Sequence, residues 1–189
     1  MYLNPNQHLR KLENQDELED ILKRNDIESS YTSVDTIRRT LIRMKINPNE
    51  EDLYSKFTLR RVPVGNMITN QPYLCNRILN LIPTHTWEEE SNEFYEHGGY
   101  FNLLTLPVFL TPCLKRQYVF FGNTRANFTY HLYNKANAKI ISLIINDDRA
   151  IDYAEKKFDN KFPINIIDLK INSPEDVKDQ YVRSVYHLK

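Results

Sequence analysis

The sequence predicts a small α/β domain, a mixed sheet with flanking helices, preceded by a short helical extension. From residue 57 onward, short runs rich in β-branched and aromatic residues alternate with stretches of helical periodicity, as in folds that cover a sheet with helices. The 189 residues are enough for one well-packed core with an extension and too few for two full-sized domains. We therefore divide the chain into a helical extension, residues 1–55, and an α/β domain, residues 56–189.

Two amphipathic helices are predicted in the extension. Residues 15–26 place apolar side chains at helical spacing, with acidic residues in the first turn and basic residues in the last, which suits the helix dipole. The second helix is predicted within residues 32–48, where Ser33 can cap its start and Pro48 lies just beyond its end. The pair resembles a helical hairpin or a helix-turn-helix.

The α/β domain is predicted to open with a strand at residues 57–63 and to continue with alternating elements. Residues 138–147 form an apolar run of strand length, long enough to be buried on both faces of a sheet. The other predicted elements, in chain order, are a helix begun near Pro72, an acidic helix or loop at 87–99, strands at 100–112 and 115–121, helices at 126–134 and 149–158, a strand at 164–172, and a final helix at 173–189 capped by Ser173.

Charge and composition exclude several classes of function. The 25 basic and 25 acidic residues cancel, so no overall field draws the protein to nucleic acid or to an anionic membrane. No apolar stretch approaches the roughly 18–20 residues that span a bilayer, and the N-terminus lacks the apolar core of a secretion signal. Cys75 and Cys113 lack the spacing of a zinc site, so no metal site is predicted. We expect both to be reduced core thiols of a cytoplasmic protein with no membrane partner.

A polar tetrad, Gly122 to Arg125, lies where the strand predicted at 115–121 turns into a helix. Such a turn points unpaired backbone N–H groups at one spot, and the helix dipole adds partial positive charge, so the turn favours an anion. Arg125 can add a planar fork of donors that matches phosphate oxygens, and Gly122 lets phosphate approach the backbone. In the alternative interpretation Gly122 and Asn123 only turn the chain, Thr124 caps the helix and Arg125 faces solvent.

The motifs around the tetrad resemble those of ParB chromosome-partition proteins, sulfiredoxins and free serine kinases. The matching stretches are RVPVGNMITNQPYL, EHGGYFNLLTLPVFL and RQYVFFGNTRANFTYHLYNKANAKIISLIINDD, which cover about residues 57–150. In that family a V-P box opens the domain, and a Y-apolar-apolar-x-G-x-x-R motif begins the helix that holds nucleotide phosphates. The resemblance implies a ParB/sulfiredoxin-like fold that binds a nucleoside triphosphate such as ATP, with Mg²⁺. Gly122, Asn123, Thr124 and Arg125 would line the phosphates, with Asn70 and Gln71 near the same pocket.

This chain departs from the catalytic residues of the family. Sulfiredoxins have a cysteine where this chain has Asn123, and ParB proteins that hydrolyse CTP have glutamate there and a second arginine where this chain has Thr124. The serine kinases have an acid at the position of Phe121. A base would have to come from elsewhere, for example from the acidic run at 88–96, so we expect at most a weak NTPase or phosphotransferase. A nucleotide-gated regulator of a DNA or protein partner, from a phage, plasmid or other mobile element, fits the same resemblance.

A GIY-YIG nuclease is one alternative. Two triplets, Pro107-Val108-Phe109 and Phe120-Phe121-Gly122, have the spacing of that motif, and Arg125, His131 and Glu155 follow. Such a nuclease uses tyrosine hydroxyls at the reacting centre, however, and both positions are phenylalanine here. Because a benzene ring cannot exchange that proton, the nuclease would be degenerate.

The other alternative is a DNA-binding or adaptor protein that acts without nucleotide. Residues 37–61 carry a local excess of basic side chains, and Arg38, Arg39 and Arg43 lie on one predicted helix. Basic residues on the face of a helix can contact DNA phosphates. They are also ordinary on a helix surface, so these three residues are candidate DNA contacts only.

Overall fold

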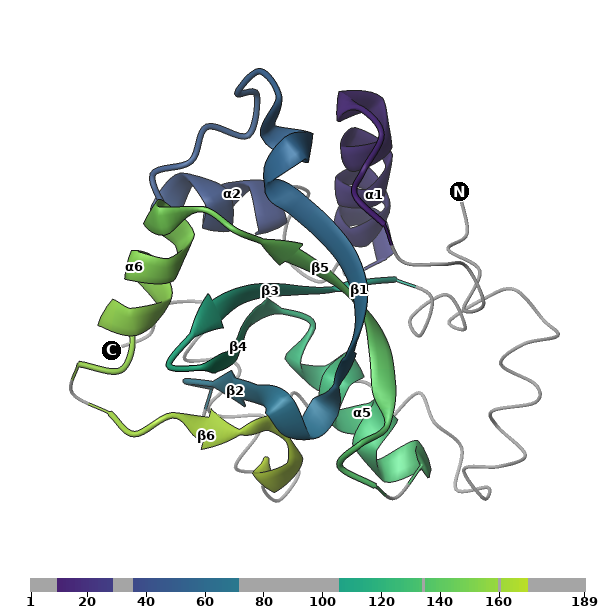
Figure 1. Ribbon diagram of the computed structural model, residues 1–189, viewed down its shortest axis with the longest axis vertical. Helices are drawn as coiled ribbons and strands as arrows, with labels where there is room; N and C mark the ends of the chain where they lie inside the picture. The colour runs from purple at the N-terminus through teal and green to yellow at the C-terminus, as the bar shows by residue number, and fades with distance from the viewer. Residues whose placement is uncertain (1–9, 29–35, 72–105, 134, 160, 170–189) are drawn as a thin grey trace, which may run out of the picture.

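The computed structural model describes residues 10–28, 36–71, 106–133, 135–159 and 161–169 (Figure 1). Several predictions fall outside these residues: the Ser33 cap, the helix near Pro72, the acidic run at 88–96, Cys75, and the final helix with its Ser173 cap. Within the described residues, the fold is mixed α/β, with a six-stranded sheet and four α-helices.

The sheet has the strand order β1-β5-β3-β4-β2-β6. Its strands are β1 (Phe57–Pro63), β2 (Met67–Thr69), β3 (Val108–Cys113), β4 (Arg116–Phe121), β5 (Lys139–Ile145) and β6 (Ile164–Asn165). The helices are α1 (Gln15–Glu28), α2 (Thr36–Arg43), α5 (Asn123–Tyr133) and α6 (Asp148–Lys156), with 3-10 turns η1 (Leu53–Lys56), η2 (Val64–Asn66) and η4 (Ile166–Asp168). The sheet is mixed, because β3 is parallel to β5 and antiparallel to β4.

The segment β4–α5–β5 runs strand–helix–strand within one sheet, as the sequence predicts, but its two strands are antiparallel, because β3 between them is antiparallel to β4 and parallel to β5. Its two strands lie in the same sheet on either side of β3. In β5, every residue after Lys139 is buried, which confirms the prediction of a strand covered on both faces. Helix α5 begins at Asn123, three residues before the predicted start at residue 126.

Hydrophobic cores lie on both faces of the sheet because side chains alternate along each strand. On β3, Phe109 faces the helices α1 and α2, whereas Val108 and Leu110 face α5 and η4. The first core includes Leu18, Leu22, Ile37, Leu41, Phe57, Phe109, Leu143 and Ile145, and the second includes Val108, Leu110, Val119, Ala126, Ile140, Ile144 and Ile166. The two helices predicted in the extension therefore cover one face of the sheet, in the upper half of Figure 1.

The strand predicted at 164–172 is shorter than expected. Among its described residues only Ile164 and Asn165 pair in the sheet, and the 3-10 turn η4 follows directly. The side chain of Asn127 donates hydrogen bonds to the carbonyl oxygens of Ile166 (2.8 Å) and Leu169 (3.3 Å). Because this amide on α5 takes acceptors that a strand would direct to a neighbouring strand, the chain folds onto the helix instead.

A group of charged side chains joins the segment before β1 to the start of α6. Asp147 caps α6 by accepting from the backbone N–H of Arg149, and its carboxylate also pairs with the guanidinium of Arg149 (2.8 Å) and with Lys56 (3.1 Å). Glu50 accepts from the same two cations. Hydrogen bonds, chiefly from Arg149, hold the pKa of Asp147 well below its usual range, so the carboxylate is charged throughout the physiological pH range.

The low pKa of Asp147 predicts a specific loss of stability in acid. A carboxylate whose pKa is lower in the folded state stabilises the fold above its unfolded pKa, near 4, and this contribution is lost as the pH falls below about 4. We expect Asp147→Asn, which keeps a capping oxygen, to lower the free energy of unfolding by about 1–2 kcal/mol at pH 7. Urea denaturation should show that the difference in the free energy of unfolding between the wild type and Asp147→Asn becomes smaller towards pH 2.

The matched control is Asp152→Asn, which removes a carboxylate from an exposed pair with Lys156 on the same helix. This change should leave the unfolding midpoint nearly unaltered at both pH values, since exposed pairs contribute little. Equal effects of the two variants would show that the part-buried network around Asp147 adds nothing to stability.

Candidate functional site

The turn between β4 and α5 requires glycine at its first position. Gly122 has φ 97°, a left-handed conformation that side chains with a Cβ rarely adopt. A Cβ there would also lie 2.9 Å from Nη2 of Arg125 and 3.2 Å from a methyl carbon of Val108. The glycine therefore makes room for the arginine three residues later, and its carbonyl accepts the hydrogen bond from Ala126 that opens the helix.

Arg125 is buried, with 4% of its surface exposed, so the expectation that it faces solvent is wrong. Its Nη2 donates to Oδ1 of Asn25 on α1 (3.1 Å) and to the carbonyl oxygen of Pro107 (2.9 Å). The guanidinium carbon lies 5.4 Å from the centroid of the Phe121 ring. The side chain thus folds back under the turn and joins α5 to α1 at the end of the sheet where β3 begins.

The charge of Arg125 is not balanced by a carboxylate among the described residues. Both acceptors of its Nη2 are neutral, and its Nε is buried without a hydrogen-bond partner. Burial lowers the pKa of Arg125 to about 10, which still leaves the guanidinium charged at pH 7. A buried cation and the positive end of the α5 dipole therefore act at the same place, and both favour an anion there.

The side chains above the buried cation are polar and uncharged. Nδ2 of Asn123, the first residue of α5, donates to Oε1 of Gln71 (3.0 Å), so the turn and the segment after β2 are in contact. Oδ1 of Asn123 is buried and has no partner in the described structure. Asn70 is bonded elsewhere, to the hydroxyl of Tyr118 (3.1 Å). Thr124 lies inside the first turn of α5 and so does not occupy the cap position.

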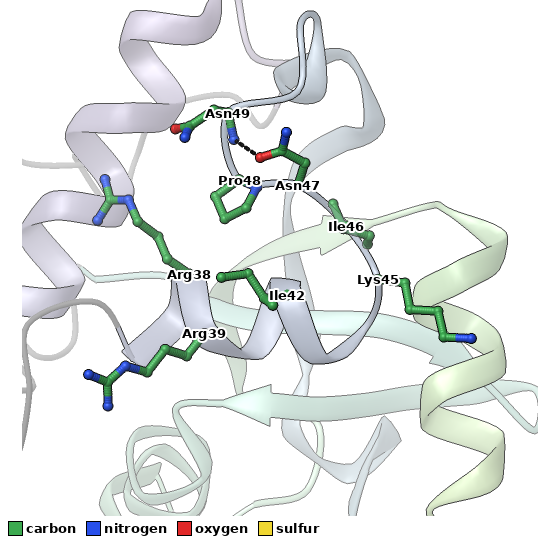
Figure 2. A pocket seen from close by; sticks show the side chains of 8 residues that line it. All are labelled: Arg38, Arg39, Ile42, Lys45, Ile46, Asn47, Pro48 and Asn49. Atoms are coloured by element: carbon green, nitrogen blue, oxygen red, sulfur yellow. Dashed lines mark hydrogen bonds between the residues drawn. The ribbon is translucent and has the colours of Figure 1, made fainter.

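The candidate DNA contacts lie apart from this turn. Arg38, Arg39 and Arg43 are on α2, which packs on the opposite face of the sheet from α5. Arg38 pairs with Glu19 of α1 (2.8 Å), whereas Arg39 is exposed and lines a pocket beside α2 (Figure 2). The structure therefore does not bring these arginines together with the tetrad.

The first triplet of the nuclease alternative is buried, and the two phenylalanines of the second are partly buried and pack against the core. Phe109 and Phe121 are paired across β3 and β4, with ring centroids 6.1 Å apart in an edge-to-face arrangement. Phe109 is fully buried, so packing accounts for the aromatic residue at this position. Elsewhere in the core, burial raises the pKa of the Cys113 thiol to about 11, which keeps it protonated and unreactive, as expected for a core thiol.

Asn25 is the contact that sequence reasoning missed. It lies on the same helical face as Leu18, Ile21 and Leu22, and it is fully buried. Its own Nδ2 donates to the carbonyl oxygen of Ile21 (2.8 Å), which leaves Oδ1 directed to Arg125. A polar residue at an apolar position of an amphipathic helix is the signal that predicts such a buried contact.

Across the part of the chain that the structure describes, no three His, Cys, Asp or Glu side chains group in a way that could hold a metal ion. None of the described helices combines the length and apolar character that crossing a bilayer requires. No protein-family model matches the chain, and no curated protein and no solved structure matches it. The geometry of the turn is therefore the basis on which a function can be argued.

The burial of Arg125 predicts that it supports the fold. We expect Arg125→Ala to lower the free energy of unfolding by about 2–3 kcal/mol, because it opens a cavity and leaves Asn25 and the Pro107 carbonyl without their donor. Urea denaturation monitored by circular dichroism measures this change. The control is Arg61→Ala on β1, which removes an exposed arginine and should hardly move the midpoint. Indistinguishable midpoints for the two variants would mean that Arg125 is exposed in solution.

Proposed function

We propose that this protein binds the phosphates of a nucleotide at the turn Gly122 to Arg125, in the manner of the ParB/sulfiredoxin superfamily. The observation that carries the proposal is the buried Arg125 guanidinium, which has no carboxylate partner among the described residues and lies at the N-terminal end of α5. A charge removed from water in this way is costly unless an anion compensates it. A phosphate group above the turn would supply that compensation.

The direct contacts of the phosphate come from the backbone and from amide side chains. The first N–H groups of α5 have no acceptor within the helix and point towards the turn. Asn123 and Gln71, already bonded to each other, flank this position and can donate to phosphate oxygens. Arg125 acts from below the turn through its field, since its Nη2 is engaged by protein acceptors.

Mg²⁺ binds together with the nucleotide in this proposal. Mg²⁺ is held largely by phosphate oxygens and water in nucleotide sites, so it neutralises the phosphates without a dedicated set of protein carboxylates. The order of sequence motifs around the turn supports a triphosphate in particular, because the resembling family binds one with the same strand-to-helix turn.

Asn123→Asp provides the test of this site. Asp cannot donate to Gln71 as Asn123 does, but a negative charge at the first residue of α5 suits the helix dipole and offsets this loss, so the variant should be about as stable as the wild type without ligand. The same charge repels phosphate. At a nucleotide concentration of 100 times the Kd we expect the wild-type Tm to rise by about 5–10 °C and the Asn123→Asp Tm to stay nearly constant.

The matched control is Asn66→Asp, which makes the same change at an exposed position outside the turn and should keep the full shift. Differential scanning fluorimetry with ATP, GTP and CTP, each with and without Mg²⁺, and with inorganic phosphate, gives the comparison. Equal shifts in the wild type and Asn123→Asp would reject the site. A shift of the same size with inorganic phosphate would reduce it to a general anion site.

Hydrolysis of the bound nucleotide should be slow or absent. The positions at which related proteins carry an acid are Asn123 and Phe121 here, so the described turn contains no base for the attacking water. We expect phosphate release far below the turnover of about 10 per second that is typical of enzymes. A turnover near that value, measured with saturating nucleotide and Mg²⁺, would show that a carboxylate from 88–96 or elsewhere acts as the base.

A further inference from the structure

A second candidate binding surface lies on the other side of the sheet, between α2 and the loop that follows it. It is an open pocket of about 620 Å³ (Figure 2). This volume is in the range of sites that hold small ligands or a few residues of a peptide. Its chemistry differs from that of the turn at Gly122, so it is argued independently of the proposed nucleotide site.

The centre of the pocket is apolar. Ile42 is 60% exposed although it is a large aliphatic residue, and its side chain extends from α2 towards Pro48 in Figure 2. Ile46 and Pro48 also line the pocket but are themselves buried, so Ile42 supplies the exposed apolar surface. An aliphatic side chain placed here would remove the exposed surface of Ile42 from water, which is favourable.

The edge of the pocket is basic. Arg39 and Lys45 are exposed on opposite sides of Ile42, and neither forms an ion pair within the described structure. Residues 38–45 contain four basic side chains and no acidic one. Arg38 also lines the pocket but is paired with Glu19 of α1, and Glu50, the next carboxylate along the chain, is paired with Lys56 and Arg149. The charge at the pocket is therefore positive and available to an acidic partner.

The conformation of Lys45 is one that glycine usually provides. Ile46 N–H bonds to the carbonyl of Leu41 (2.9 Å) and Lys45 N–H to that of Ile42 (2.9 Å), the pattern that ends a helix with a left-handed residue. Lys45 is that residue, with φ 62°. The backbone of Lys45 is used in this way, whereas its ammonium forms no hydrogen bond or ion pair within the described structure and so is available to an acidic ligand.

The wall of the pocket is held in place before any ligand binds. Nη1 of Arg149 donates to the carbonyl oxygen of Lys45 (3.2 Å), while Nη2 of the same guanidinium bonds to Glu50 and Asp147. The loop after α2 is thus fixed to α6 by charged hydrogen bonds. A fixed wall reduces the entropy that binding would otherwise cost.

We propose that this pocket binds an acidic peptide segment of a partner protein, with an aliphatic side chain against Ile42 and Pro48 and carboxylates at Arg39 and Lys45. The apolar centre distinguishes this partner from nucleic acid, since a phosphodiester backbone would leave Ile42 without an apolar contact. Nucleic-acid contacts are dominated by phosphate, which needs basic groups and no apolar centre.

NMR titration of the ¹⁵N-labelled protein tests the proposal with four probes. These are the blocked pentapeptide Asp-Leu-Leu-Glu-Asp, its basic counterpart Lys-Leu-Leu-Lys-Lys, the acidic peptide without leucine Asp-Ser-Ser-Glu-Asp, and a short DNA duplex. We expect the first peptide to shift the amide signals of residues 38–49 and the other three probes to leave them unchanged. The absence of any shift with about 5 mM of the first peptide would mean a Kd too weak for a functional contact and would overturn the proposal. A larger shift with DNA than with the first peptide would also overturn it.

Substitutions with opposite effects on stability and binding sharpen the test. Lys45→Gly should raise the Tm by about 2 °C, because glycine adopts φ 62° without steric cost, and weaken peptide binding about threefold. Lys115→Gly is the matched control, because Lys115 is also exposed and has φ 62°, in the β3–β4 turn. This variant should raise the Tm by the same amount and keep the full peptide affinity. Ile42→Ser should weaken binding about tenfold. Equal affinities of Lys45→Gly and Lys115→Gly would overturn the assignment of Lys45.

Discussion

The buried guanidinium of Arg125 is the interaction on which the arrangement of this protein depends. Through neutral acceptors it connects α5 to α1 and to the residue before β3, and it requires the glycine at position 122. Neutral acceptors satisfy its donors only in part and leave its charge uncompensated. The same side chain therefore serves the packing of the two layers and creates the positive potential at the turn.

Some of the described charges form ion pairs and others do not. Although the chain has no net charge, its acidic residues Glu17, Glu19 and Asp147 are used to bind Arg10, Arg38 and Arg149 in pairs that hold elements together. Arg125 below the α5 turn has no such partner among the described residues, and neither do Arg39 on α2 and Lys45 just after it. These two places lie on opposite faces of the sheet, so an anion at one and an acidic segment at the other would not compete for the same surface.

The sequence predicts those parts of the fold that depend on local pattern. Apolar runs and periodicity predict the strands at 57–63 and 139–145 and the segment β4–α5–β5, because these patterns can be recognised without knowledge of distant contacts. The three-residue strand β2 was not predicted, because three residues carry too little periodicity to be recognised. The position of Arg125 was misjudged for a different reason: its acceptor Asn25 is 100 residues away, so no local pattern around the tetrad reveals its burial. Gln71 was placed near the tetrad by resemblance, and its contact with Asn123 could not have been derived from spacing alone.

The bond between Asn25 and Arg125 also constrains how the chain reaches its native state. Two residues separated by 100 positions meet in it, and the core that contains α1 and α2 is completed by residues of β5. During synthesis the first two helices leave the ribosome long before these partners exist. Their apolar faces are then exposed to solvent, as in the folding intermediates that chaperones bind. Contacts between residues so far apart in the sequence are also associated with slow folding. The architecture that places a cation beneath the α5 turn thus leaves the apolar faces of α1 and α2 without their native partners until β5 has been made.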